Sequence, residues 1–499
     1  MSSGRSLRRI LALSGVGLML AAAAPATAPL AQVDGGSVRG AASDDGAVLL
    51  FRGIPFAAPP VGDLRWRPPQ PAASWPGVRD AAGPAAPCIQ NDQGWNRGDY
   101  LAGREDCLTL DVATQSLAGK RPVLVWIHGG SNRAGSPGDM ITSPVVRERV
   151  VLVGVRYRLG IFGFLSTRAL SAEGKGASGN YALMDQIAAL KWVQRNIARF
   201  GGDPGNVTLA GESAGSQDVG LLLATPAARG LFAKAIMESG TPGFGLPDRS
   251  LEQAERIGDQ AEAWLGTGGD LARLRSVSVP ALLAADLRLH DDALEADDLI
   301  WLRATIDGAV FARAPRDLLA EAPARPVLLG TNRVELDLPG GRPHRDALVA
   351  RAFGAREAEA RAFYELDRPD PPADPRLGSR DQQIATDIVF RCPTGTLAAL
   401  LAGRGAPVWR YEFDLAPGGG PTRHALEISY VFGESRSASG LSLRPYWVQF
   451  VKTGDPNGPG LTAWPRFTAN GGAHMTFEEN SFRAAGPLRP QPCALMDRL

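Results

Sequence analysis

The feature that most constrains this chain is a serine between two glycines, at the junction of an apolar stretch and a helical one. The sequence GESAG occupies residues 211–215, directly after the apolar run at 207–211. Glycines on both sides permit a turn too tight for side chains, which would hold Ser213 in a strained conformation at the edge of a sheet. The helix that follows would point its unpaired N–H groups at the serine. This context favours a nucleophilic serine over a chance match to a short motif.

Apolar runs alternate with helical stretches along much of the chain. The runs are continuous rather than alternating with polar residues, which is typical of parallel strands buried on both faces. Strand–helix alternation predicts an α/β fold with a mostly parallel central sheet and helices on both of its faces. The predicted core strands are 122–128, 150–157, 207–211, 233–239, 326–332 and 407–413. Two shorter runs, 36–40 and 48–56, are predicted to form a hairpin before them.

The helical stretches fall into two groups. Residues 181–200 carry apolar side chains at spacings of three and four, which indicates one helical face, and Gly201 ends the pattern. Residues 241–320 and 337–400 are rich in Ala, Leu, Arg and Asp and interrupt the alternation. We interpret these two segments as helical insertions that cap the carboxyl edge of the sheet, where ligands bind in open α/β sheets. Residues 32–499 are therefore predicted to form a single domain.

The N-terminus has the pattern of a signal peptide. A positively charged start precedes an apolar run and a group of small residues, and residues 1–31 are predicted to be removed. Cleavage is expected between Ala26 and Gln32, giving a secreted or periplasmic product without a stable membrane anchor. The alternative, a retained anchor, is disfavoured because the apolar run is short for a bilayer and no other stretch is long and apolar enough.

The net charge and the cysteine content give expectations about partners, metal sites and disulfides. The formal net charge is +1, which gives no electrostatic case for nucleic acid as a partner. No His or Cys spacing suggests a metal site. In an oxidising compartment the four cysteines favour two disulfides. Cys88 is predicted to pair with Cys107, and Cys392 with Cys493; two buried free thiols are the alternative for the second pair.

A second glycine-containing loop follows the predicted strand 122–128. Its sequence HGGSNRAG begins at His128. Glycines in such a loop let backbone N–H groups approach a developing oxyanion without obstruction. His128 is interpreted as a residue that orients the loop, with a direct role as catalytic base as the alternative.

Two stretches resemble the signature sequences of the type-B carboxylesterase/lipase family. They are FGGDPGNVTLAGESAG at 200–215 and EDCLTLDV at 105–112, and the resemblance extends over roughly residues 33–470. This family of α/β-hydrolases includes the cholinesterases and bacterial esterases similar to para-nitrobenzyl esterase. The resemblance implies an α/β-hydrolase fold with helical cap insertions and a serine carboxylesterase that needs no metal and no cofactor. Other matching segments are FRGIPFAAPPVGDLRWRPP, YRLGIFGFLS, IMESG and ISYVFG.

The resemblance also implies a catalytic triad in the order serine, glutamate, histidine. The nucleophile would be Ser213, the acid Glu335 in GTNRVEL, and the base His424 in GPTRHALE. Such a histidine takes the proton of the serine, and the carboxylate holds the imidazole in the correct tautomer. Asp337 is the alternative acid. The other histidines, His290, His344 and His474, have no comparable context.

The backbone N–H groups of Gly130, Ser131 and Ala214 are the implied oxyanion hole. Ser131 departs from the family, which usually has a third glycine there, and this affects geometry and substrate range. Asp218 stands where many relatives have a small hydroxyl residue; it is interpreted as a structural residue, or else as a hydrogen-bond partner near the base. Glu212 is interpreted as a buried structural carboxylate.

The predicted function is hydrolysis of carboxylic esters, with small-molecule esters as substrates, through an acyl-enzyme on Ser213. A lipase acting on longer chains, an amide or carbamate hydrolase and a non-catalytic binding protein are the alternatives. Trp95, in the loop between Cys88 and Cys107, is interpreted as a packed aromatic, with a site for a quaternary ammonium group as its alternative.

Overall fold

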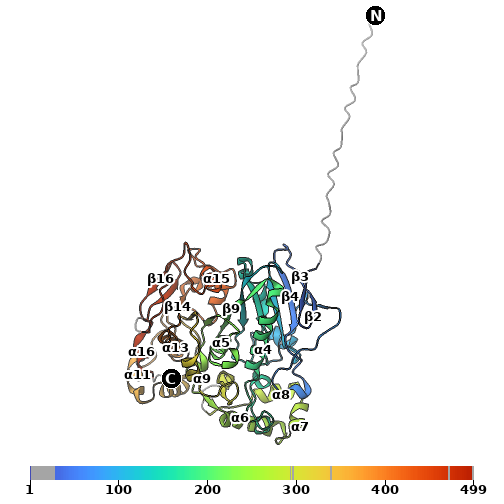
Figure 1. Ribbon diagram of the computed structural model, residues 1–499. Coiled ribbons are helices and arrows are strands. Elements are labelled where there is room, and N and C mark those ends of the chain that lie inside the picture. Colours follow the sequence, from blue (N-terminus) through green and yellow to red (C-terminus); the bar gives the residue numbers. More distant parts are fainter. Residues whose placement is uncertain (2–27, 293, 295–296, 338–339, 470–471, 497–499) are drawn as a thin grey trace.

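A large twisted sheet passes through the middle of the molecule (Figure 1). The computed structural model describes residue 1 and residues 28–496, apart from 293, 295–296, 338–339 and 470–471. Most of the predicted signal peptide, residues 2–27, lies outside the described residues. Residues 30 and 31, at the end of that predicted segment, already belong to strand β1 (Leu30–Val33).

Within the described residues the central sheet has 11 strands. Neighbouring strands from β8 to β15 pair in parallel, and the strands at the two ends of the sheet pair antiparallel. All six predicted core strands are present, although β9 begins earlier than predicted. In spatial order the strands are β16 (Ser481–Ala485), β15 (His474–Glu478), β14 (Val408–Asp414), β13 (Val327–Asn332), β10 (Lys234–Glu238), β9 (Gly202–Glu212), β7 (Arg121–Ile127), β8 (Val151–Val155), β6 (Thr109–Thr114), β4 (Leu49–Pro55) and β3 (Ala41–Ala42).

The side chains of the core strands are buried on both faces of the sheet. Along β7, Val123 and Val125 belong to the hydrophobic cluster that contains α4 (Tyr181–Asn196) and α5 (Ala214–Ala224). Leu124 and Trp126 belong to the cluster on the opposite face, with α14 (Glu427–Val431) and α15 (Arg444–Thr453). This alternation explains why the strands read as continuous apolar runs.

The predicted N-terminal hairpin is wrong. Strand β2 (Gly36–Arg39) pairs with β1 and with β5 (Val78–Asp80) in a separate small sheet, whereas β4 pairs with β3 and β6 in the central sheet. The chain passes from one sheet to the other at Gly40, where a Cβ atom would lie 2.4 Å from the carbonyl oxygen of Leu50. The two runs therefore have suitable strand composition but different partners.

The two predicted insertions are largely helical. Helices α6, α7 and α8 of the first lie together at one end of the molecule (Figure 1). The first segment contains β11 (Arg249–Ser250), α6 (Leu251–Leu265), α7 (Leu271–Ser276), α8 (Val279–Asp286), β12 (Thr305–Ile306) and α9 (Pro315–Glu321). The second contains α10 (Gly341–Phe353), α11 (Glu357–Phe363), α12 (Arg380–Ala385), a π-helix (Thr386–Arg391) and most of α13 (Cys392–Gly403). The other helices are α1 (Arg97–Ala102), α2 (Gly160–Phe164), α3 (Arg168–Glu173) and α16 (Pro490–Leu495).

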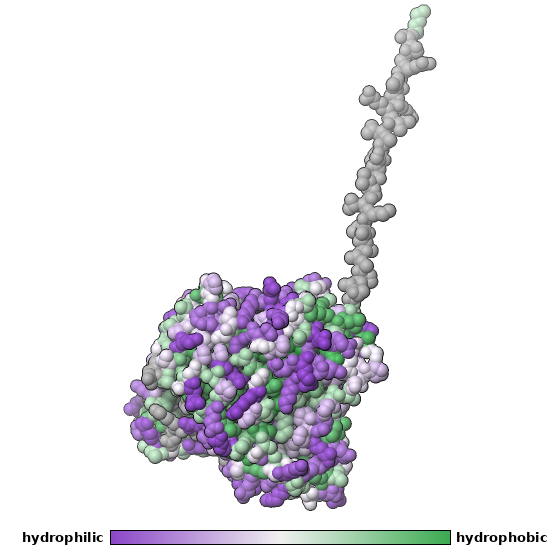
Figure 2. Space-filling model, in the orientation of Figure 1, coloured by the Kyte–Doolittle hydropathy of each residue, from purple (hydrophilic) through white to green (hydrophobic). Residues whose placement is uncertain are grey.

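One helical run in the described part of the chain is long and apolar enough to cross a membrane, which the sequence analysis missed. It extends over Arg380–Gly403, and 67% of its most apolar window is buried inside the protein. Its last part, α13, packs against β13 and β14. This burial is typical of a core helix. Hydrophilic side chains cover much of the molecular face in Figure 2, with apolar residues interspersed.

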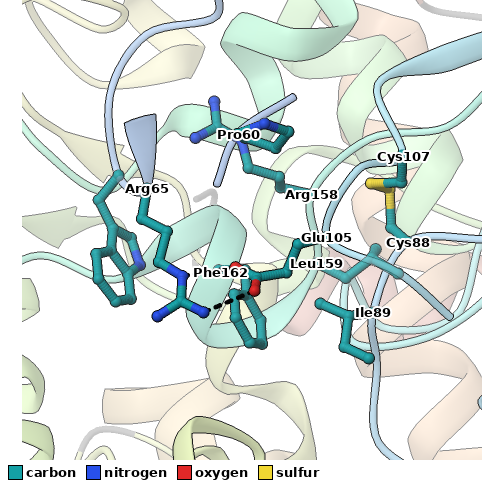
Figure 3. A pocket seen from close by; sticks show the side chains of 10 residues that line it. Pro60, Arg65, Cys88, Ile89, Glu105, Cys107, Arg158, Leu159 and Phe162 are labelled. Atoms are coloured by element: carbon teal, nitrogen blue, oxygen red, sulfur yellow. Dashed lines mark hydrogen bonds and ion pairs between the residues drawn. A yellow bond between two sulfur atoms is a disulfide. The ribbon is translucent and has the colours of Figure 1, made fainter. Parts of the chain in front are cut away.

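Both predicted disulfides are present. Cys88 and Cys107 close the loop that carries α1. Beside this disulfide, Arg65 forms an ion pair with Glu105 at 2.6 Å (Figure 3). Arg65 also donates to the backbone carbonyl of Val277, just after α7. These contacts connect the disulfide loop to the first insertion.

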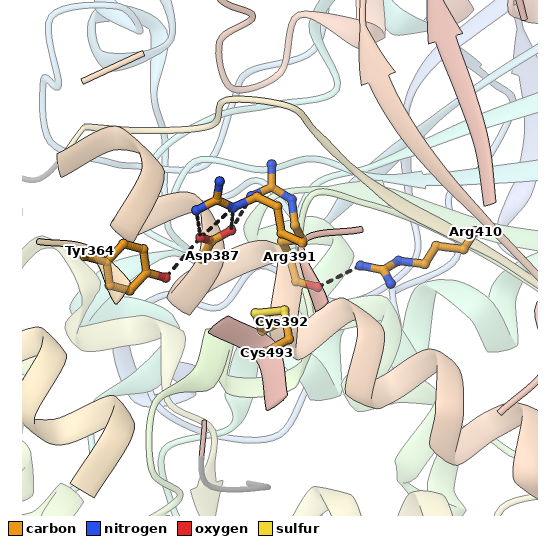
Figure 4. The surroundings of a disulfide bond; sticks show 7 residues. Tyr364, Asp387, Arg391, Cys392, Arg410 and Cys493 are labelled. Carbon is orange, nitrogen blue, oxygen red and sulfur yellow. Dashed lines mark hydrogen bonds and ion pairs between the residues drawn. A yellow bond between two sulfur atoms is a disulfide. The ribbon is translucent and has the colours of Figure 1, made fainter. Parts of the chain in front are cut away.

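The second disulfide joins Cys392, at the start of α13, to Cys493 on α16 (Figure 4). Close to it, the fully buried carboxylate of Asp387 pairs with Arg391 and Arg489 and accepts a hydrogen bond from the Tyr364 hydroxyl. The C-terminal helix is therefore held by a covalent bond and by charged contacts.

Removing the second disulfide is expected to destabilise the protein strongly. The two cysteines are 101 residues apart, and cross-linking a loop of that length stabilises by about 4–5 kcal/mol on the chain-entropy model. The double change Cys392→Ser, Cys493→Ser should lower the free energy of unfolding by that order, measured by denaturant titration. The matching change at Cys88 and Cys107, 19 residues apart, should cost about 3 kcal/mol. Equal losses for the two pairs would contradict the loop-length argument.

Candidate active site

Ser213 lies in the tight turn that the sequence predicts. It has φ 56° and ψ −125°, between the end of β9 and the first residue of α5. A Cβ atom on Gly211 would lie 2.5 Å from the carbonyl carbon of Gly215, and one on Gly215 would lie 2.1 Å from the carbonyl oxygen of Ile127. The backbone N–H of Ser213 donates to the carbonyl of Glu238 at 2.9 Å. The glycines are thus required sterically, and β10 holds the strained residue in place.

The change Gly215→Ala is expected to prevent this turn from forming. The added methyl group would collide with backbone atoms of β7, which cannot move without separating the strand from α5. We expect loss of the cooperative thermal unfolding transition, or a much lower Tm, together with loss of esterase activity. The control is Gly403→Ala at the end of α13, where an added Cβ meets nothing within 4 Å. A Gly215→Ala protein with the Tm of the unaltered chain would contradict the steric argument.

Ser213 opens into a cavity of about 740 Å³. This is within the size range of small-molecule sites. His424, Glu212 and the loop segment 129–131 also line it. Four of the sequence-predicted site residues, from three distant parts of the chain, therefore line one cavity: Gly130, Ser131, Ser213 and His424. Its apolar wall includes Trp95, Trp126, Met140, Leu336 and Ile428.

His424 and Glu335 form a direct contact. Nδ1 of the imidazole lies 2.8 Å from Oε2 of the carboxylate, and the backbone N–H of His424 donates to the carbonyl of Glu335 at 3.0 Å. The other carboxylate oxygen accepts from the N–H of Asn332, the last residue of β13, at 2.7 Å. Glu335 is thereby fixed just beyond the carboxyl end of a core strand. Nε2 of His424 is buried and makes no hydrogen bond with any described residue.

Glu212 lies closer to the histidine than the sequence analysis predicts. It is buried, as expected, but its Oε1 is 3.2 Å from Nε2 of His424. Burial alone would lower the pKa of His424, but the carboxylates of Glu212 and Glu335 raise it to about 9. Burial also raises the pKa of Glu212, to about 8, in spite of the nearby imidazole. Glu212 is therefore an electrostatic partner of the histidine as well as part of the turn.

The loop after β7 lies against the nucleophile turn. A Cβ atom on Gly129 would be 3.0 Å from the Cβ of Ser213, and one on Gly130 would be 2.1 Å from the carbonyl oxygen of Ala134. Gly130 has φ 105°, and Ser131 has φ 55°. Ala214 follows Ser213 as the first residue of α5. Of the residues predicted to provide oxyanion donors, Gly130 and Ser131 line the same cavity as Ser213, and Ala214 is its neighbour in the chain.

His128 fits the structural interpretation made from the sequence, and Trp95 does not. His128 is buried, stacks on Tyr157 at 4.4 Å between ring centroids, and has a pKa lowered by burial to about 4. Its ring is therefore neutral at ordinary pH. Trp95, interpreted from the sequence as a packed aromatic, is instead 65% exposed and lines the cavity beside Gly130.

Three residues around the histidine were not found from the sequence. Glu427 accepts from the Asn332 side chain at 2.7 Å, and burial raises its pKa to about 7. The Thr386 hydroxyl accepts from the N–H of Glu335 at 3.1 Å, and Phe390 packs against the ring of His424. Glu427 follows His424 at helical spacing, which is a weak signal. Thr386 and Phe390 lie in the second insertion, and nothing in the sequence pattern connects that segment to the site.

A strained serine at the strand–turn–helix junction of a mostly parallel sheet is the defining arrangement of the α/β-hydrolase fold. The chain belongs to the carboxylesterase family, whose profile matches residues 27–496. Among its relatives, fumonisin B1 esterase of Sphingopyxis macrogoltabida is 36% identical over 464 residues, covering 87% of this chain and 84% of the relative. Para-nitrobenzyl esterase of Bacillus subtilis (strain 168) is 34% identical over 465 residues, covering 87% and 91%.

Solved structures agree with this assignment. A PNB esterase structure aligns with a TM-score of 0.80 and 31% identity, over 94% of this chain and 100% of that chain. A carboxylesterase structure from Geobacillus stearothermophilus aligns with a TM-score of 0.78 and 30% identity over the same shares. These likenesses confirm the resemblance stated from the sequence. The protein is a carboxylic ester hydrolase with an α/β-hydrolase fold.

Proposed function

We propose that this protein is a secreted or periplasmic serine carboxylesterase that uses Ser213, His424 and Glu335 as its catalytic triad. The observation that carries the proposal is the state of the imidazole. One nitrogen is bound to Glu335 at 2.8 Å. The other makes no hydrogen bond with a described residue, lies 3.2 Å from Oε1 of Glu212, and belongs to a ring that lines the same cavity as Ser213. That is the arrangement a general base needs to take the proton of a serine hydroxyl.

The reaction follows from these positions. Nε2 of His424 takes the proton as Ser213 Oγ attacks the ester carbonyl, and Glu335 stabilises the imidazolium. The N–H groups of Gly130, Ser131 and Ala214 receive the negative charge of the tetrahedral oxygen. The imidazolium then gives its proton to the leaving alcohol, which leaves an acyl group on Ser213. Water, deprotonated by the same imidazole, attacks the acyl carbonyl and releases the acid.

Two features support a neutral small ester and an extracellular location. Arg133, the one arginine or lysine among the described residues that line the cavity, is buried and paired with Asp286 at 2.9 Å, so it does not supply a free cation for an acidic substrate. Two disulfides are typical of oxidising compartments. The names of the relatives state substrates of those proteins only. The substrate of this chain has to be determined by assay.

Turnover of p-nitrophenyl esters from acetate to palmitate tests the proposal and its lipase alternative. We expect the highest kcat/KM on short, dissolved esters, with no activation when the substrate forms an emulsion. A marked rise in rate at the onset of emulsion formation would favour the lipase. Absence of turnover on every ester in the series would overturn the proposed function.

The contact between Glu212 and His424 predicts a specific pH effect. The base acts in its neutral form, so kcat/KM should rise as the pH passes upward through the pKa of His424, which is raised to about 9. Above the pKa of Glu212, which is about 8, the change Glu212→Gln removes a negative charge 3.2 Å from Nε2 and so lowers the pKa of His424. The acid limb of the pH profile should therefore move to lower pH, by about one unit or more. Glu252→Gln, at an exposed position of α6, is the control and should leave the profile in place. An unchanged limb in Glu212→Gln would contradict the electrostatic role.

A further inference from the structure

Asp218 connects the nucleophile helix to two other elements. It is fully buried on α5, the helix that begins directly after Ser213. Its Oδ2 accepts a hydrogen bond from the side chain of Gln186 on α4 at 2.6 Å, and its Oδ1 accepts one from the side chain of Asn132 at 3.2 Å. Burial raises the pKa of Asp218 to about 6, so the side chain is a carboxylate at neutral pH.

Asn132 belongs to a turn of unusual backbone conformation. The carbonyl of Gly130 accepts from the N–H groups of Arg133 at 2.9 Å and Ala134 at 3.0 Å. The two central residues, Ser131 and Asn132, have φ 55° and 57°. Positive φ at both central positions is the mark of a type I′ turn, which favours Gly, Asn and Asp. Serine is a poor residue for such a conformation, so the turn depends on contacts outside itself.

Those contacts converge on Asn132. Its carbonyl accepts from the N–H of Gly160 at 2.7 Å, and its side-chain amide donates to Asp218 and, at 3.4 Å, to the carbonyl of Trp301. The direction of the N–H groups at residues 130 and 131 is set by the backbone angles of the same turn. A change in these angles would turn the donors away from Ser213, against which the loop is packed.

We propose that Asp218 is a positioning residue for the oxyanion hole, holding the side chain of Asn132 and through it the type I′ turn at residues 130–133. The proposal rests on the proposed function, because it takes Gly130 and Ser131 as donors to the oxyanion. The proposal gives one explanation for the two departures from the family pattern, Ser131 and Asp218. The carboxylate at 218 supports a turn that has a serine where the family usually has a glycine.

A conservative variant separates this role from simple packing. In Asp218→Asn the side-chain oxygen can still accept from Asn132, and its amide can donate to Gln186 Oε1, a buried atom that has no hydrogen-bond partner among the described residues. Both bonds therefore survive once the Gln186 amide rotates. Asp218→Ala removes both.

The primary test compares these variants in ester hydrolysis. Asp218→Ala is expected to lower kcat about 10- to 100-fold with KM within about threefold, since the oxyanion forms only in the transition state. The inhibition constant of a trifluoromethyl ketone, whose hemiketal places an oxyanion in the hole, should rise by the same factor. Asp218→Asn should remain within a few-fold of the unaltered protein. Val219→Ala, fully buried on the same helix, is the control for packing and should keep kcat.

A double-mutant cycle tests whether Asp218 acts through Asn132. Asn132→Gly removes the side chain but tolerates positive φ, and Asp218→Ala should add almost nothing in that background if Asp218 acts through Asn132. Independent, multiplying losses would overturn the proposal, as would loss of kcat in Asp218→Asn equal to that in Asp218→Ala.

Two further measurements cover a variant that does not fold and a failure of the proposed function itself. If Asp218→Ala does not fold, Asn132→Gly alone decides: a fall in kcat at constant KM supports the proposal, and unchanged kcat overturns it. Ester hydrolysis that persists in Ser213→Ala would instead contradict the proposed function. If ester hydrolysis depends on Ser213 but kcat is normal in every Asp218 and Asn132 variant, only this inference is contradicted.

Discussion

Replacing Ser213 by alanine is expected to abolish ester hydrolysis almost completely, lowering kcat by roughly 10⁶-fold. Without the hydroxyl no acyl-enzyme can form, and only uncatalysed or weakly assisted attack by water remains. The substitution should barely affect stability, because the backbone N–H rather than the side chain of Ser213 makes the contact with Glu238. Initial rates with a p-nitrophenyl ester and a thermal unfolding curve measure the two effects.

Ser216 provides a matched control on the same turn of helix. It is fully buried, and its hydroxyl donates to the carbonyl of Gly240 at 2.8 Å rather than lining the cavity wall. Ser216→Ala should cost about 1 kcal/mol of stability through the lost hydrogen bond and leave kcat within a few-fold. Equal loss of activity in the two variants would mean that the turn, and not the hydroxyl of Ser213, is the sensitive element.

The second largest effect is expected for Glu335→Gln, which should lower kcat by roughly 10⁴-fold. Glutamine keeps the size of the side chain, but its amide can present a donor to Nδ1 of His424, which stabilises the wrong tautomer. The imidazolium also loses the carboxylate that lies 2.8 Å away. KM should change much less than kcat, because Glu335 does not line the cavity wall.

Asp337→Asn tests the alternative acid. Asp337 is exposed, two residues beyond Glu335, and the histidine contact belongs to Glu335. The Asp337 variant should keep its activity. The assignment of the acid would be contradicted if Asp337→Asn lost activity and Glu335→Gln retained it.

The parts of the fold that local pattern determines were predictable. Strands buried on both faces, such as Val151–Val155, read as apolar runs because both sides of the sheet are covered. The GESAG turn was predictable because its steric demand falls on residues adjacent in sequence, Gly211 and Gly215. The number of disulfides followed from compartment and cysteine count, and both predicted pairings are present.

Pairings between distant segments were not predictable in the same way. The run at 36–40 has strand composition, but its neighbours are β1 and β5, and no local signal distinguishes them from β4. The contact of Glu212 with His424 depends on how the segment after β14, which carries His424, lies over the end of β9. Asp218 and Asn132 are 86 residues apart, and only the packing of α5 against the loop after β7 brings them together.

Labelling with a fluorophosphonate probe followed by peptide mass spectrometry tests the central claim most directly. We predict a single phosphonylated residue, Ser213, with no labelling in Ser213→Ala and slow labelling in His424→Ala, in which the base that activates the hydroxyl is missing. Modification of a different serine, or equally fast labelling of Ser213 when His424 is absent, would contradict the proposed catalytic arrangement.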